Sequence, residues 1–146
     1  MQVRVKIDSA YKEAQVIILS EAMTEEVNEI IRKLSWENIK MLPGYKEGKM
    51  ELIDPAEVVR IYALSGKVYA VTSKGEYLLR MRIYEIEMKL DGDIFVRISN
   101  SEIINLKQTE NFDLNMTGTI CVRMLNGDTT YVSRRYTAKL KKVLGI

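Results

Sequence analysis

Residues 119–144, TICVRMLNGDTTYVSRRYTAKLKKVL, predict a β-hairpin that runs directly into a helix. Apolar and polar residues alternate on both sides of Asn126-Gly127, a dipeptide that supplies the two positive φ angles of a type I′ turn. Ser133 is the expected N-cap, and the apolar residues after it recur at helical spacing. The segment therefore favours a β-rich fold with a short helix packed on its strands.

The start of this helix carries unusual charges. Arg134 and Arg135 lie in the first turn, where the helix dipole is positive and each cation costs about 0.3–1 kcal/mol unless an anion lies nearby. The chain has no acidic residue after Asp128, and residues 60–146 carry 14 Lys and Arg against 9 Asp and Glu. We infer a polyanion partner for this part of the chain, although a solvated face explains the lysines of the helix equally well.

The composition limits the classes of function. The chain has 146 residues, 47% of them hydrophobic, with a net charge of +2, one cysteine and no histidine. Because the usual nucleophile pairs and imidazole metal ligands need histidine, we expect no enzyme, no metal site and no cofactor. Cys121 lies in a strand pattern, where a buried thiol is the commoner outcome. No apolar run approaches the roughly 18 residues that span a bilayer, and the first residues lack a secretory signal, so we expect a cytoplasmic protein.

The rest of the chain predicts a β-rich α+β fold, with short helices on antiparallel sheets. Residues 2–8 and 14–20 are expected to be paired strands, followed by an amphipathic helix over residues 23–35 with Thr24 as its N-cap. The turn residues within 42–55 predict a short hairpin and a domain junction, which divides the chain into residues 1–49 and 50–146. Further expected elements are strands at 58–63, 67–73, 77–81, 94–99 and 107–115, and a turn or short helical segment at 100–106.

Polar side chains gather at the predicted junctions between elements. Lys67 lies beside a tight loop, Asn100 follows a strand, Asn105 lies five residues on, and Arg135 opens the last helix. Arg and Lys pair with guanine, and Asn with adenine, so these residue types on loops held by a sheet suit the reading of base edges. The alternative is that the two asparagines cap or bridge the turn between them. It stays open for Asn100 and is favoured for Asn105.

Two ordered motifs carry a family resemblance. FVRISNSEIINL (95–106) and VRMLNGDTTYVSRRYTAKLKKVL (122–144) resemble the LytTR family of DNA-binding domains, which show a Phe-x-Arg-x-His-x-Ser-x-x-Val-Asn segment and a later Val-Ser-Arg-Arg-Tyr segment. Ser99 stands where many relatives have His. The resemblance covers roughly residues 50–146 and implies elongated antiparallel sheets whose loops enter successive major grooves. The matching positions are Phe95, Arg97, Ser101, Asn105, Val132, Ser133, Arg134, Arg135 and Tyr136.

The resemblance also implies a site on double-stranded DNA for a transcriptional regulator. By similarity, base contacts fall on Asn100, on Arg135 and on the loop where Lys67 is the nearest candidate. Two alternatives stay open: a β-rich protein-interaction or ligand-sensing module, and a single-strand binder that uses exposed tyrosines. The residues expected at the DNA backbone are Arg97, Ser101, Ser133, Arg134, Lys139 and Lys142. The residues assigned to structural motifs are Asn105, Asn126 and Gly127.

Residues 1–49 leave no room for a phosphoacceptor domain, so phosphorelay activation is not expected. The chain instead resembles the stand-alone branch of small LytTR regulators, in which a membrane protein encoded nearby often restrains activity. Kinship implies such an inhibitor as a partner. A homodimer on repeated half-sites is also expected, with residues 1–49 serving dimerisation or regulation.

Overall fold

The structure, a computed structural model, describes residues 1–35, 39–114 and 118–146. The chain forms two compact units, Met1–Ser35 and the remainder up to Ile146. The division falls after Ser35 rather than at residue 49, because the hairpin of residues 42–53 pairs with the sheet of the second unit.

The first unit contains one helix, α1 (Glu25–Ser35), and no strand. Thr24 caps the helix as predicted, since its Oγ1 accepts the Val27 N–H at 3.2 Å. The predicted strands at 2–8 and 14–20 are wrong, and their apolar side chains are largely exposed. The physical reason is that nothing within the unit would cover either face of such a strand pair, and an isolated two-stranded hairpin is marginally stable in water.

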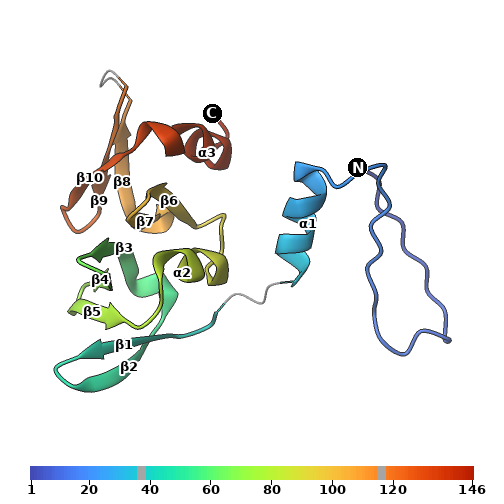
Figure 1. The fold of residues 1–146 in the computed structure, drawn as a ribbon, viewed down its shortest axis with the longest axis horizontal. Helices are drawn as coiled ribbons and strands as arrows, with labels where there is room; N and C mark the ends of the chain where they lie inside the picture. The colour runs from blue at the N-terminus through green and yellow to red at the C-terminus, as the bar shows by residue number, and fades with distance from the viewer. Residues whose placement is uncertain (36–38, 115–117) are drawn as a thin grey trace. The chain divides into compact units, whose positions relative to one another are not determined.

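The second unit is built on a seven-stranded antiparallel sheet with the order β2-β1-β5-β4-β3-β7-β6. A three-stranded sheet, β10-β9-β8, and the helix α3 lie at one side of this unit, and the β1–β2 hairpin lies at the other (Figure 1). The β-rich α+β prediction is confirmed. The bounds are β1 Leu42–Lys46, β2 Lys49–Ile53, β3 Val58–Leu64, β4 Lys67–Thr72, β5 Gly75–Leu79, α2 Ile83–Lys89, β6 Phe95–Ser99, β7 Glu102–Asn105, β8 Thr109–Asp113, β9 Ile120–Met124, β10 Thr129–Val132 and α3 Arg134–Leu144, with 3₁₀ turns at Pro55–Glu57 and Leu106–Gln108.

The part of the large sheet formed by β3, β4, β6 and β7 contributes buried side chains on both faces. One face packs with α2 around Ile61, Ala70 and Ile86, and the other packs with the small sheet and α3 around Ile98, Val122 and Leu140. Successive side chains of a strand point to opposite faces, so two adjacent apolar residues place one side chain in each core. Burying an Ile or Leu side chain stabilises the fold by about 1.5–3 kcal/mol. These buried side chains hold the strands in place, and so they also fix the positions of the strand ends.

A turn or short helical segment was predicted for residues 100–106. This prediction is wrong for the middle of the segment, which forms the strand β7. The run Glu102–Asn105 shows no alternation, because Ile103 faces one core and Ile104 the other. The strand expected at 107–115 is observed as β8, and residue 115 lies outside the described residues.

The hairpin of β9 and β10 is confirmed, but its turn differs from the prediction. Asn126 does not have a positive φ, and Gly127 does, at 93°. The Met124 N–H donates to the Asp128 carbonyl at 2.8 Å, which leaves a three-residue loop. The two-residue turns with paired positive φ angles are Glu47-Gly48 and Ser65-Gly66.

Candidate nucleic-acid interface

Three connections of the second unit lie close together at one end of the strands of the large sheet. The β3–β4 turn and the β6–β7 turn are neighbours because β3 pairs with β7, and the Ala63 N–H donates to the Ser101 carbonyl at 2.8 Å. The start of α3 joins them, since the Ser133 N–H donates to the Ile98 carbonyl at 2.8 Å. We call residues 65–67, 100–101 and 133–135 the loop edge. The fold therefore brings Lys67, Asn100 and Arg135 to one edge.

Asn100 is exposed and is held from two sides. Its Oδ1 accepts a hydrogen bond from the Tyr136 hydroxyl at 2.9 Å, and its carbonyl accepts one from Arg97 Nη2 at 2.6 Å. Among the described residues the amide nitrogen donates no hydrogen bond, and the amide oxygen keeps a second lone pair, which is the pattern that adenine requires. Tyr136 thus connects the β6–β7 turn to α3 and orients the amide.

Arg97 braces the same turn from within the protein. Its Nε donates to the Ser99 carbonyl at 3.0 Å, and Nη1 lies 3.5 Å from Glu87 Oε2. The guanidinium carbon also lies 5.8 Å from the centre of the Tyr136 ring. Arg97 is mostly buried and holds the β6–β7 turn through these bonds, whereas the DNA-backbone contact expected for it stays a prediction.

The start of α3 combines positive charge with a helix end that has no side-chain cap. Ser133 is the N-cap, as predicted, but its side chain makes no capping hydrogen bond, and the first turn has no acid. Arg134 Nε donates to the Gly118 carbonyl at 3.3 Å. The exposed Arg135 has no hydrogen bond or ion pair within the described residues. Free backbone N–H groups and the helix dipole make such a terminus suited to an anion.

The remaining side chains expected at the DNA backbone lie beside the loop edge or further along α3. Ser101 is exposed, and its Oγ lies 3.4 Å from Ser99 Oγ. Lys139 is exposed, with its Nζ 3.7 Å from Glu87 Oε1. Lys142 is exposed on the same helix. Lys67 is exposed at the start of β4 and makes no hydrogen bond or ion pair among the described residues.

Asn105 and Asn126 lie away from this surface and hold the backbone. Asn105 is 1% exposed; its Nδ2 donates to the Val58 carbonyl at 2.8 Å, and its Oδ1 accepts the Lys107 N–H at 2.9 Å. Asn126 Oδ1 accepts the Asp128 N–H at 3.0 Å, and these two residues flank Gly127 in the β9–β10 turn. Both amides therefore serve turns of the fold.

An ion-pair network that the sequence did not reveal joins the two sheets. Arg60 on β3 reaches Glu102 Oε1 and Asp128 Oδ2, each at 3.0 Å, and the Thr130 hydroxyl donates to Glu102. Burial lowers the pKa of Arg60, but the bond to Asp128 and the charge of Glu102 outweigh it and raise the pKa overall. Partial burial raises the pKa of Asp128, and the hydrogen bonds from Arg60 and Asn126 outweigh it and lower the pKa. The network fixes the β9–β10 hairpin that leads into α3.

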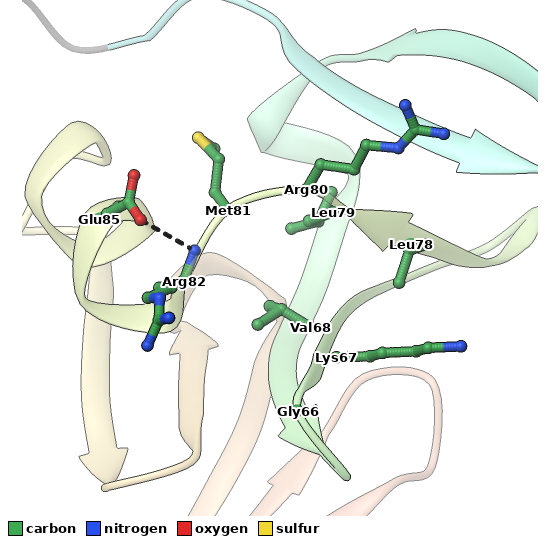
Figure 2. Close-up of a pocket in the computed structure, with 9 residues that line it drawn as sticks. All are labelled: Gly66, Lys67, Val68, Leu78, Leu79, Arg80, Met81, Arg82 and Glu85. Carbon is green, nitrogen blue, oxygen red and sulfur yellow. Dashed lines mark hydrogen bonds between the residues drawn. The ribbon is translucent and has the colours of Figure 1, made fainter.

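Sequence reasoning also missed Arg80 and Arg82, which follow β5 and precede α2. Both are exposed and line a shallow pocket with Lys67 and Glu85 (Figure 2). A signal was present, because Arg82 is the residue before a helix, where an acid or hydroxyl is preferred. The start of α2 differs from that of α3 in that its first turn contains an acid, Glu85.

Exposed amide, hydroxyl and basic side chains on loops held by a rigid sheet are typical of nucleic-acid-binding domains. The comparison with protein families agrees with this class. Residues 48–145 match the LytTr DNA-binding domain, and the chain belongs to this family.

Relatives and a solved structure show similarity over long parts of the chain. A protein of Staphylococcus aureus strain MSSA476, named as an HTH-type transcriptional regulator, is 30% identical, over 100% of this chain and 99% of its own length. A protein from strain MRSA252, also named as an HTH-type transcriptional regulator, is 29% identical over 100% of this chain and 99% of its own length. A solved LytTr DNA-binding domain from Bacillus cereus is 21% identical, with a TM-score of 0.71, and covers 75% of this chain and 100% of that domain.

The names of these relatives contain the abbreviation for helix-turn-helix, but the described residues contain no such pair of helices. Five strands separate α2 from α3. A search of the described residues also finds no helix with the length and apolar character to cross a membrane.

Proposed function

We propose that this LytTR family protein is a sequence-specific regulator of transcription that reads double-stranded DNA through its loop edge. Asn100, Arg135 and Lys67 contact bases in the major groove, one from each of the three connections. The observation that carries the proposal is the start of α3, where two arginines occupy a helix terminus without a capping side chain or an acid. A phosphate-rich partner removes the cost of that arrangement.

The DNA backbone is contacted on both sides of the reading residues. Ser101, Ser133 and Arg134 flank the base contacts, and the lysines at positions 139 and 142 extend the positive surface along α3. Arg97 braces the β6–β7 turn, and the DNA-backbone contact expected for it stays a prediction. Phosphate contacts position the protein, and base contacts specify the sequence.

The assembly follows from the same reading. We propose a homodimer on repeated half-sites about one helical turn apart, located in the cytoplasm with its DNA. Support comes from the first unit, where apolar side chains such as Val5, Ile7 and Leu19 are more than three-quarters exposed and lack a partner surface within that unit. A membrane-protein inhibitor encoded nearby remains a proposal by kinship, with residues 1–49 as the dimerisation or regulatory segment.

Selection of bound fragments from random duplex DNA tests the proposal. We expect enrichment of one sequence, present as two half-sites, and an affinity for it that falls steeply with salt. Fluorescence anisotropy on the selected duplex, on a scrambled duplex and on the single strand measures the preference. A chain that binds all three alike, or none, contradicts sequence-specific duplex binding.

A further inference from the structure

Three cations line one pocket where β5 leaves the sheet: Lys67 of the loop edge, and Arg80 and Arg82, which lie outside the three connections assigned above. Val68 pairs with Leu79 across β4 and β5, and continuing that register by one residue places Lys67 opposite Arg80. Arg82 lies two residues further on, and the same pocket is lined by all three. Figure 2 shows the long side chains of Lys67 and Arg80 extending to the same side of the strands. Like charges facing each other across strands destabilise a sheet unless an anion lies between them.

The neighbourhood does not neutralise these charges. Glu85 is the one acid among the residues that line the pocket, and its Oε1 accepts the backbone N–H of Arg82 at 3.4 Å. Arg80 makes no ion pair within the described part of the chain; its guanidinium carbon lies 3.9 Å from the centre of the Tyr45 ring. Stacking on an aromatic face holds a guanidinium in place while its N–H donors stay available.

The cluster continues the loop edge on the side away from α3. The strand order β7-β3-β4-β5 places the end of β5 three strands from the β6–β7 turn that carries Asn100. Neighbouring strands lie about 4.8 Å apart, so this separation is about 14 Å. The major groove is about 12 Å wide. The cations at the end of β5 are therefore separated from Asn100 by more than the width of the groove, so they reach past the bases of that groove to its phosphates when the row of strand ends lies across it.

We propose that Arg80 and Arg82 bind DNA phosphates at the outer flank of each half-site, beyond the bases that the loop edge reads. This inference rests on the proposed function and adds a second basic surface to it. Lys67 stands between the two surfaces and keeps its assignment as a base-reading residue. The phosphate contacts raise affinity for every sequence alike, because the sugar–phosphate backbone carries no base information.

The test compares the full chain with the double variant Arg80→Gln, Arg82→Gln on the selected duplex over a range of salt concentrations. We expect roughly tenfold weaker binding at low salt, because each lost contact is charge-assisted. We also expect a slope of log affinity against log salt that is shallower by about 1.8, from about 0.9 for each contact. The ratio between selected and scrambled duplex should stay unchanged.

Two matched variants separate charge from packing. Lys49→Gln removes an exposed cation beside the β1–β2 turn, at the opposite end of the sheet, and should leave the slope as it is. Arg80→Lys, Arg82→Lys restores the charge without the guanidinium and should recover the wild-type slope. Thermal unfolding of every variant checks that the Arg80 and Tyr45 contact is not needed for folding.

Duplexes trimmed one base pair at a time locate the contact. Wild type should lose affinity when the outer flank is removed, and the double glutamine variant should not. If wild type binds its site and the glutamine variant matches it in affinity and slope, the phosphate assignment is overturned while the proposed function stands. If wild type binds no duplex, both fall together.

Discussion

The two 11-residue helices of the chain, α1 and α3, begin in opposite ways. At α1, Thr24 caps the backbone and two acids, Glu25 and Glu26, occupy the first turn. At α3, Ser133 makes no side-chain cap and Arg134 and Arg135 take the place of the acids. Acids at a helix N-terminus are favoured by about 0.3–1 kcal/mol and cations are opposed by a similar amount. The start of α1 stabilises its own helix, whereas the start of α3 costs free energy in the isolated protein, which agrees with the anion partner proposed for it.

The largest effect should come from removing the anchor of α3. Leu140 is fully buried in the core between the sheets, so Leu140→Ala should lower the free energy of unfolding by about 2–5 kcal/mol. Ile31→Ala makes a matched cut in α1, where the side chain is 38% exposed, and should cost less than about 1 kcal/mol. Urea unfolding followed by circular dichroism measures both. Equal losses would show that packing does not distinguish the two helices.

Arg135→Ala should change binding and stability in opposite directions. Loss of a base contact weakens specific binding by about 1–3 kcal/mol, whereas removal of a cation from the positive end of α3 stabilises the free protein by up to about 1 kcal/mol. Anisotropy titration and urea unfolding of the same preparation give the two numbers. Lys141→Ala, at the other end of the helix, should act weakly and alike on all sequences. If Arg135→Ala binds the selected site as tightly as wild type, Arg135 does not read a base.

The sequence predicted those parts of the fold whose pattern is local, and it failed where a strand depends on contacts with distant segments. The β9–β10 hairpin and α3 were predictable because their patterns are local, and the inverted charges of Arg134 and Arg135 stood in the sequence itself. The alternation in residues 2–8 was misleading, since alternation does not supply a covering layer. β7 was missed for the opposite reason: it is buried on both faces and shows no alternation.

The site was harder to predict because its geometry depends on contacts between distant segments. Asn100 was proposed from its place after a strand and from the family resemblance, but its hydrogen bond from Tyr136 spans 36 positions and could not be predicted. The brace by Arg97 depends on a turn whose shape the sequence did not reveal. Arg80 and Arg82 lie next to Lys67 only because β4 and β5 pair, and that proximity could not be read along the chain.

The two N-cap residues give a direct and smaller test of the contrast. Thr24→Ala removes an observed capping bond and should cost α1 about 1 kcal/mol, seen as lost helical signal. Ser133→Ala removes a hydroxyl without a capping bond, so stability should change by less than about 0.5 kcal/mol while affinity for DNA falls. Circular dichroism and anisotropy measure the pair. A large stability loss in Ser133→Ala would mean that the hydroxyl caps the helix in solution.

The smallest expected effect concerns the ion-pair network that fixes the hairpin leading into α3. Because the pKa of Asp128 is lowered in the folded state, its contribution is present above the pKa of the unfolded chain, near 3.9, and is lost as the pH falls through the folded value. The side chain is 36% exposed, so solvent screening limits the effect to about 0.5 kcal/mol at pH 7. Asp128→Asn should therefore be less stable than wild type at pH 7 and approach it below about pH 4. Urea unfolding across this range, with the exposed Asp93→Asn as control, measures the difference, and a gap that stays constant with pH would assign the role of Asp128 to its hydrogen bonds rather than to its charge.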